Sequence, residues 1–260
     1  MALLEAHNVT VSFGGLVAVN DVSIAVERRE VVGLIGPNGA GKTTLLAALS
    51  GIIIPRQGRV LIDGVNATAM DPEQRALAGM ARTFQRLELF RKLTVADNLL
   101  VAAESRFGEV DFMADLLGRT RRGKADRLAN RVLKRLGLQE VASRWADEVP
   151  LGVGRLVEVG RALCTEPRLL LLDEPSGGLD DAETDRLADV LRDVRRGDGP
   201  AMLIVEHDVD LVMELSDRVY VMDFGRLIAE GTPKQVRRDP VVQAAYLGTE
   251  VSAAAAARHS

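Results

Sequence analysis

One short segment has the spacing of a phosphate-binding loop. Residues 36–43 fit the pattern G-x-x-x-x-G-K-[ST] and lie between an apolar strand-like run and a helix-like run. Glycines let the backbone wrap tightly and bring its N–H groups to phosphate oxygens. The helix that follows directs its N-terminal dipole at the same anion. We therefore expect a nucleoside triphosphate site; the alternative is a glycine-rich turn with a chance Lys-Thr pair.

Two side chains of this loop are expected to contact the nucleotide and its metal ion. Lys42 supplies a positive charge to the β- and γ-phosphates, and Thr43 offers a hydroxyl ligand to Mg²⁺. The residues predicted to line this part of the site are Gly36, Pro37, Asn38, Gly39, Ala40, Gly41, Lys42, Thr43 and Thr44.

A second candidate site is an apolar run, residues 169–172, that ends in Asp173 and Glu174. Such a run is typical of a buried parallel strand, and ligands bind at the C-terminal ends of strands in open α/β sheets. Asp173 is then placed to hold Mg²⁺ through a water molecule, and Glu174 to polarise the attacking water. The alternative is an acidic pair exposed to solvent.

The elements that must position these residues alternate along the chain. Strands are predicted over residues 7–12, 22–26, 31–35, 59–63, 168–172, 201–205 and 218–222. Helices are predicted over residues 72–80, 153–165, 181–196 and 208–215. The later alternation indicates a parallel sheet with right-handed crossovers.

One stretch breaks this alternation. Residues 95–137 have helical apolar spacing and end at Gly137, which predicts an inserted helical region with a looser loop near residues 105–124. The alanine-rich residues 251–260 are expected to be frayed or lightly helical.

Composition and charge argue against several classes of protein. The formal net charge is −4, and the basic cluster within residues 119–124 is expected to be a solvated helix end or loop, so we expect no nucleic-acid partner. The single cysteine, Cys164, excludes a disulfide framework and is expected to be a small core residue. We see no signal peptide and no apolar stretch near the ~20 residues that span a bilayer, so any membrane spans would belong to another chain.

The order of these motifs resembles the nucleotide-binding subunits of ABC transporters, over about residues 4–248. Residues 36–43 are similar to Walker A and residues 169–173 to Walker B. Glu174 stands at the position of the catalytic glutamate. The resemblance implies that the chain is a Mg-dependent ATPase with ATP and Mg²⁺ as its cofactors, and that Lys42 and Glu174 act in catalysis.

Four further residues gain a role only from this resemblance. Gln85 resembles the Q-loop glutamine that senses Mg²⁺ and the membrane partner, and His207 resembles the switch histidine that contacts the γ-phosphate, which implies a catalytic role. Asp180 resembles a D-loop residue, and Phe13 the aromatic residue that stacks on adenine. The resemblance implies that Gln85, Asp180 and Phe13 belong to the nucleotide site. The implied metal ligands are Thr43, Gln85 and Asp173.

One segment departs from the family's signature, which is close to L-S-G-G-Q. Counting back without gaps places residues 149–153 there, so that Pro150 replaces the serine and offers neither a hydroxyl nor an N–H, while Gly152 remains. In the family this segment of one protomer closes on the ATP of the other. We therefore predict a working but weakened composite site that keeps the Gly152 N–H and the helix dipole.

The resemblance implies an α/β fold: a P-loop NTPase (RecA-like) core with an N-terminal antiparallel β subdomain and an inserted α-helical subdomain. The expected divisions are residues 1–85 for the first part of the core with the β subdomain, 86–153 for the helical subdomain, 154–248 for the second part of the core and 249–260 for a flexible tail.

Finer similarity points to a subgroup. Residues 13–20, 82–85, 89–90, 93–99, 231–233 and 245–248 look like the ATP-binding subunits of branched-chain amino-acid importers. Urea and short-amide importers share this look, as does, more distantly, the lipopolysaccharide-export ATPase. A non-transport ABC ATPase and a P-loop small-molecule kinase are the alternatives; the first usually has coiled coils or tandem cassettes, and the sequence has neither.

The resemblance to this subgroup implies partners and a cellular location. The partners are membrane permease subunits, a second ATPase protomer (the same chain or a different one) and, indirectly, a solute-binding protein. The expected location is the cytoplasmic face of the inner membrane, as a peripheral subunit. The permease contact is expected around Gln85 and residues 87–99, where core packing of the apolar side chains is the alternative. The sequence does not name the solute.

Overall fold

The parallel sheet that carries the phosphate-binding loop lies at the centre of the molecule. The computed structural model describes residues 2–106 and 121–246, so much of the predicted loop near 105–124 and the whole predicted tail lie outside the described residues. The sheet order is β10-β9-β3-β8-β7-β6. Its members are β3 (Val31–Ile35), β6 (Met80–Arg82), β7 (Leu169–Asp173), β8 (Ala201–Val205), β9 (Arg218–Asp223) and β10 (Arg226–Gly231). All neighbours pair in parallel except β9 and β10, as the alternation predicts for the core.

A separate antiparallel sheet has the order β2-β1-β4-β5 and covers one side of this core. Its strands are β1 (Ala2–Phe13), β2 (Leu16–Glu27), β4 (Gln57–Ile62) and β5 (Val65–Asn66). The first two are longer than predicted, and β1 runs through an irregularity between Ala6 and Val9, where Asn8 takes a φ of 50°. A bulge interrupts the alternation of apolar residues without ending the strand.

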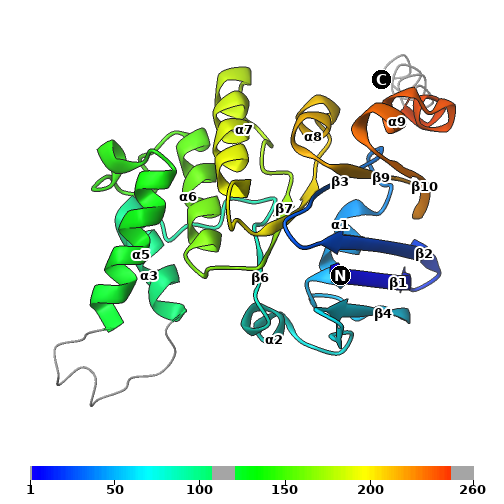
Figure 1. Cartoon of the computed structure of the whole chain (residues 1–260), viewed down its shortest axis with the longest axis horizontal. Helices are drawn as coiled ribbons and strands as arrows, with labels where there is room; N and C mark the ends of the chain where they lie inside the picture. The colour runs from blue at the N-terminus through cyan, green and yellow to red at the C-terminus, as the bar shows by residue number, and fades with distance from the viewer. Residues whose placement is uncertain (1, 107–120, 247–260) are drawn as a thin grey trace.

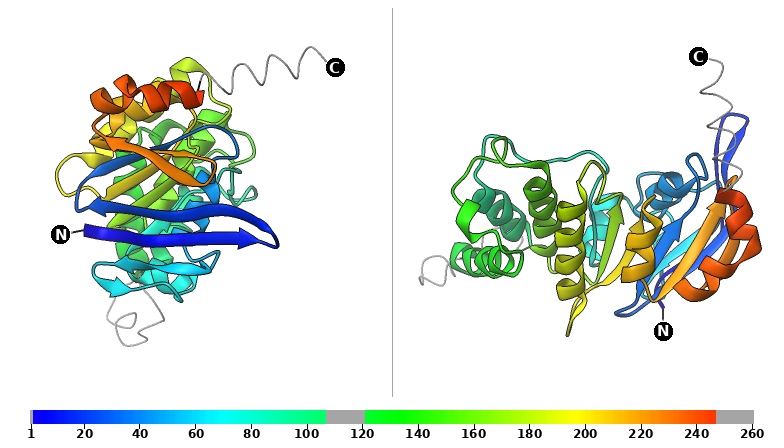
Figure 2. Two further views of the ribbon diagram at one scale, coloured as in Figure 1. Left: turned by 90° about the vertical axis from the view of Figure 1, so that its right-hand side faces the viewer. Right: turned by 90° about the horizontal axis from the view of Figure 1, so that it is seen from above.

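The helices lie on both sides of the parallel sheet and in a separate group beyond its β6 edge (Figure 1). They are α1 (Lys42–Leu49), α2 (Pro72–Leu77), α3 (Val95–Ser105), α5 (Arg121–Arg135), α6 (Leu151–Leu163), α7 (Asp181–Arg195), α8 (Val209–Leu215) and α9 (Pro233–Arg238), with a 3-10 turn η1 (Gln139–Val141). The helices α3 and α5, which lie in the region predicted to be helical, pack together, and α6, most of which was assigned to the second part of the core, packs against both. Figure 2 shows this region at one end of the molecule and the antiparallel sheet at the other.

The two faces of β7 are buried in different cores. Leu169 and Leu171 belong to the cluster shared with the antiparallel sheet and α1. Leu170 and Leu172 belong to the cluster that continues into the helical region. Cys164 is fully buried in this second cluster, where burial and, to a smaller extent, Glu166 raise the pKa of its thiol to about 12, which confirms the prediction of a core residue.

Five elements of the described part of the chain were not predicted, namely β5, β6, β10, η1 and α9. The helix expected over residues 72–80 ends at Leu77, because Gly79 takes a φ of 89°, and Met80–Arg82 is strand β6 instead. The strand β10 and the helix α9 were also missed. No helix within residues 2–106 and 121–246 has the length and apolar composition needed to cross a bilayer.

Candidate functional site

The phosphate-binding loop joins β3 to α1 at the C-terminal edge of the parallel sheet. Gly36, Gly39 and Gly41 take φ values of 152°, 81° and 98°, which residues with a Cβ rarely adopt. A Cβ on Gly36 would lie 2.1 Å from the carbonyl oxygen of Met222, and one on Gly41 would lie 2.4 Å from that of Ala18. The loop is therefore held directly against β9 and β2, and only glycine fits at these two positions.

Lys42 is buried, and its ammonium group turns back into the loop. Its Nζ donates to the carbonyl oxygens of Gly36 at 2.6 Å and Pro37 at 3.1 Å. Burial lowers the pKa of Lys42, while nearby carboxylates, of which Glu174 contributes most, oppose this shift. The loop thus holds its own cation in place at the point where phosphate oxygens are expected.

Asp173 ends β7 with its carboxylate buried beside the loop. Its Oδ2 accepts a hydrogen bond from Arg82 Nη2 at 2.8 Å, whereas its Oδ1 has no hydrogen-bond partner among the described residues. Burial raises the pKa of Asp173, and Arg82 opposes the shift. A buried oxygen without a partner fits a ligand that brings its own donor, such as water on Mg²⁺.

A metal ion at this place would take only some of its ligands from the protein. Within the described part of the chain, no group of three or more His, Cys, Asp or Glu side chains could hold a metal ion alone. Mg²⁺ commonly uses one or two protein oxygens together with phosphates and water. Thr43 in the first turn of α1 and Asp173 fit that pattern.

Glu174 and Gln85, two residues singled out from the sequence, meet in the structure. The N–H of Glu174 donates to the carbonyl oxygen of Val205 at 2.8 Å, which fixes the residue against the end of β8. Glu174 takes a φ of 45°, an uncommon value for a residue with a side chain. Gln85 Nε2 donates to Glu174 Oε2 at 2.8 Å and so sets the direction of the carboxylate.

A buried carboxylate that the sequence analysis missed ties the surrounding loops together. Glu206 is fully buried, and its Oε1 accepts from the N–H of Ser176 at 2.7 Å while its Oε2 accepts from the N–H of His207 at 3.1 Å. The loop after β7 is thereby joined to the loop after β8. The available signal was an acidic residue directly after the apolar run of β8. The imidazole of His207 is itself 58% exposed, with Nδ1 at 3.5 Å from Glu206 Oε2.

The N-terminus of α6 holds a carboxylate. The helix follows Pro150, which makes no side-chain capping hydrogen bond. The N–H of Gly152 donates to Glu183 Oε1 at 3.1 Å. Glu183 belongs to the capping box of α7, in which its N–H donates to Asp180 Oδ1 at 2.8 Å. Gly152 and Asp180, both predicted to contact nucleotide, are thus linked through Glu183.

A family model described as "ABC transporter" matches residues 19–177 of this chain. The chain belongs to this family. A second model, described as "Branched-chain amino acid ATP-binding cassette transporter", matches residues 226–252.

Several curated proteins are similar to this ABC cassette over nearly its whole length. The high-affinity branched-chain amino acid transport ATP-binding protein LivG of Escherichia coli (strain K12) is 40% identical over 250 residues, covering 95% of this chain and 98% of LivG. BraF of Pseudomonas aeruginosa, with the same description, has the same identity and coverage. The lipopolysaccharide export system ATP-binding protein LptB of Haemophilus influenzae is 35% identical over 250 residues, covering 96% and 99% of the two chains.

Solved ATP-binding cassettes share the fold. One ATP-binding cassette of an ABC transporter superposes with a TM-score of 0.83 at 31% identity, covering 95% of this chain and 99% of the other. The ADP conformation of an ATP-binding cassette superposes with a TM-score of 0.82 at 33% identity, with the same coverage. These likenesses confirm the predicted ABC cassette fold.

Two predicted contacts of the cassette lie apart from the group around Asp173. Phe13 ends β1, pairs with Leu16 across the β1–β2 hairpin and is 52% exposed, so its side chain is accessible from solvent. Gly152 lies at the start of α6, where Glu183 is its partner.

The C-terminal part of the cassette also reaches the phosphate-binding loop, which the sequence did not predict. The N–H of Gly225, in the β9–β10 turn, donates to the carbonyl oxygen of Ala40 at 3.0 Å. Tyr246 packs on the cluster around Ile35, and burial raises its pKa to about 12 while the backbone of Gly36 opposes the shift. The loop is therefore braced from the β9–β10 turn and from the segment after α9.

Proposed function

We propose that this chain is the ATP-binding and ATP-hydrolysing subunit of an ABC importer for branched-chain amino acids. The observation that carries the hydrolytic part is Asp173 and Glu174, side by side at the strand end next to the Lys42 loop, with Gln85 holding Glu174. The amino-acid part is supported by the likeness to LivG and BraF and by the family model over residues 226–252.

Each polar side chain of the site then has a role in ATP binding or hydrolysis. Thr43 and Asp173 would hold Mg²⁺ together with phosphate oxygens, and the ion would neutralise charge on the β- and γ-phosphates. Lys42 would exchange its bonds to the Gly36 and Pro37 carbonyls for phosphate oxygens. Glu174 would orient and polarise the attacking water as a general base. His207, exposed at the end of β8, is available to the γ-phosphate.

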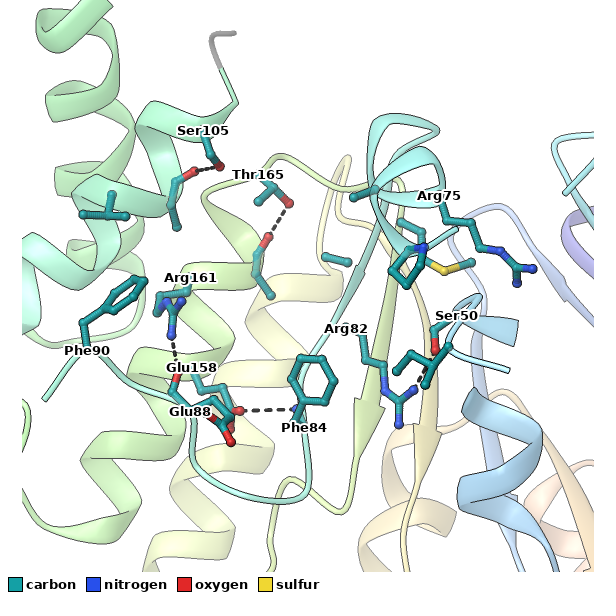
Figure 3. A pocket seen from close by; sticks show the side chains of 18 residues that line it. Ser50, Arg75, Arg82, Phe84, Glu88, Phe90, Ser105, Glu158, Arg161 and Thr165 are labelled. Carbon is teal, nitrogen blue, oxygen red and sulfur yellow. Dashed lines mark hydrogen bonds between the residues drawn. The ribbon is translucent and has the colours of Figure 1, made fainter. Parts of the chain in front are cut away.

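We further propose that the permease docks in a groove between the helical region and the core (Figure 3). A cavity of about 570 Å³ opens there, lined on the core side by α2 and β6 and on the helical side by α3 and α6. Phe84 and Phe90 lie beside it with exposed fractions of 44% and 46%, while Leu89 packs into the helical core. Of the residues near Gln85 that were expected to contact the permease, we therefore propose that Phe84 and Phe90 make the contact.

Three arginines line this groove, Arg75, Arg82 and Arg161, and the last of these is held by the helical region. Arg161 stacks on the Phe90 ring at 4.6 Å and donates to the backbone carbonyl of Glu88. Burial lowers the pKa of Arg161. A permease segment with apolar side chains fits this lining, and the assembly would lie on the cytoplasmic face of the inner membrane as a peripheral subunit.

The first test is the mass of purified Glu174→Gln by light scattering, with and without Mg-ATP. This substitution keeps the size of the side chain and removes its charge, so bound ATP should persist. A nucleotide-dependent dimer supports two composite sites made by this chain. A monomer that binds ATP contradicts the homodimer and points to a different partner ATPase.

The transport proposal needs its own test. The cassette is reconstituted with its cognate permease in liposomes, and uptake of labelled leucine, urea and a short amide is measured with ATP supplied on the cassette side. Leucine uptake that requires Glu174 is expected. ATP hydrolysis without uptake of leucine contradicts the amino-acid assignment and leaves the ATPase assignment in place.

A further inference from the structure

A second cavity, of about 640 Å³, lies on the opposite edge of the parallel sheet from the phosphate-binding loop. It is lined by Arg168 and Ala201, which stand where β7 and β8 begin, whereas Asp173 and Val205 end these strands at the nucleotide site. Residues of α5 line it from the helical region. The cavity is therefore separate from the nucleotide site and spans the junction between the core and the helical region.

The lining is strongly basic for an acidic chain. Its charged residues are five arginines and two carboxylates, Arg28, Arg29, Arg131, Arg135, Arg168, Glu166 and Asp198. The formal net charge of the whole chain is −4, so the positive charge here is a local concentration. The five guanidinium side chains are between 36% and 71% exposed, and therefore reachable by a ligand in solution.

The ion pairs around the cavity leave only a small excess of positive charge: Arg29 pairs with Asp198 and Arg135 with Asp193, so that the five arginines share four carboxylates. Arg28 and Arg168 share one carboxylate, Asp63, and both hold its pKa below the usual range, Arg168 more strongly. Arg131 lies 3.9 Å from Glu166, at the limit of an ion pair. Exposed pairs of this kind contribute little to stability, so their guanidinium groups can be turned to an incoming anion at small cost.

The floor of the cavity is apolar. Leu3, Leu128, Val132, Leu163 and Ala201 line it, and each is 8% exposed or less. Guanidinium groups match phosphate geometry through two parallel N–H bonds and are weakly hydrated. A rim of arginines over an apolar floor thus suits a ligand with phosphate at one end and a flat apolar body at the other.

We propose that this cavity binds a small organic phosphate with an apolar body. The ligand would join Arg131 and Arg135 on α5 to Arg28 and Arg29 in the turn before β3, and so hold the helical region against the core. If the chain is the ATPase proposed above, occupancy changes its rate of hydrolysis. Binding itself does not depend on that function.

The test is calorimetric titration of the variant Lys42→Ala with 1-naphthyl phosphate. This variant is used because its phosphate-binding loop should not compete with the cavity for the ligand. The same titration of the wild type with that loop filled by a non-hydrolysable Mg-ATP analogue repeats the measurement without the substitution. One site is expected, with affinity that falls as salt rises. Inorganic phosphate should bind at least about tenfold more weakly, because it leaves the apolar floor uncovered.

The arginines are tested by the double variant Arg131→Gln/Arg168→Gln. Its affinity for 1-naphthyl phosphate should fall at least about tenfold, since two charge-assisted contacts are lost. Arg59→Gln, an exposed arginine on β4, is the matched control and should bind as before; the circular dichroism and melting curves of all variants are compared. No binding, equal binding by the double variant, or binding of an acidic peptide but not of the naphthyl phosphate would each overturn the proposal.

Discussion

Two helices of this cassette, α1 and α6, are candidates to bind phosphate at their N-termini, and the surroundings of the two N-termini differ. At α1 the chain approaches through glycines, and the loop turns Lys42 onto its own carbonyl groups. At α6 the chain approaches through Pro150, and the N–H of Gly152 holds the carboxylate of Glu183. The first terminus brings its own cation, whereas the second is already bound by an anion. Binding at α6 therefore requires an exchange of one anion for another.

The largest expected effect is at α1. Lys42→Ala should reduce ATP affinity by more than about 100-fold, because hydrogen bonds from an ammonium group to phosphate oxygens are lost. Titration with a fluorescent ATP analogue measures it. Lys92→Ala, whose side chain is 93% exposed, is the control. Affinity within a fewfold of the wild type would show that the backbone N–H groups and the helix dipole suffice without the lysine.

The next effect concerns the carboxylate beside that loop. Glu174→Gln should lower steady-state ATP turnover by about 10²–10⁴, the usual contribution of a general base. Nucleotide affinity, measured on the same preparation, should stay close to that of the wild type. A turnover near the wild-type rate would remove Glu174 from the chemistry and leave Gln85 holding a structural carboxylate.

A smaller effect is expected from removing the negative charge of Glu183 at the N-terminus of α6. Glu183→Gln keeps the capping box of α7, since glutamine also serves at that position, but removes the negative charge next to Gly152. The ATP-dependent dimer should then be about three- to tenfold tighter, because a phosphate no longer competes with a carboxylate for the helix N-terminus. Sedimentation of the Glu174→Gln background measures this dimer.

The control for that change is Asp185→Asn, which removes the same charge from an exposed position on α7. An equal gain in both variants would assign the effect to net charge rather than to Gly152. A weaker dimer in Glu183→Gln would mean that Glu183 stabilises the closed arrangement instead of competing with phosphate.

The smallest effect is expected from replacing Pro150, the residue that precedes α6. Pro150→Ser supplies a hydroxyl at the start of α6 that can donate a hydrogen bond to the γ-phosphate held by the other protomer, and one such bond is worth about 1 kcal/mol, so ATP turnover should rise about two- to fivefold. Pro72→Ser, at the first turn of α2, is a matched control with no predicted effect on turnover. Unchanged turnover and ATP affinity in Pro150→Ser would remove the basis for a weakened composite site.

The sequence predicts α1 and its loop well because their signals are local. Strand β3 is a continuous apolar run, the glycines are dictated by the backbone, and the helix follows at once. That Gln85 lies near Glu174 could be inferred from the sequence only through the family resemblance, because 89 residues separate the two.

Other features were not predictable because they depend on contacts that no local pattern encodes. Strand β6 has three residues, too few to show a period, and is defined by its pairing with β7. Arg82 reaches Asp173 only through that pairing. The sequence likewise gives no sign that Glu206 faces two loops, or that Glu183 reaches Gly152 from the next helix.

The position of β3 has a consequence for the order in which the molecule is made. Its two neighbours in the sheet are β8 and β9, so the strand that leads into the phosphate-binding loop has no partner until residues 201–223 have been synthesised. The brace from Gly225 to Ala40 comes later still. A nascent chain whose Walker A sequence has already been synthesised is therefore expected to gain ATP binding only after β8 and β9 have followed.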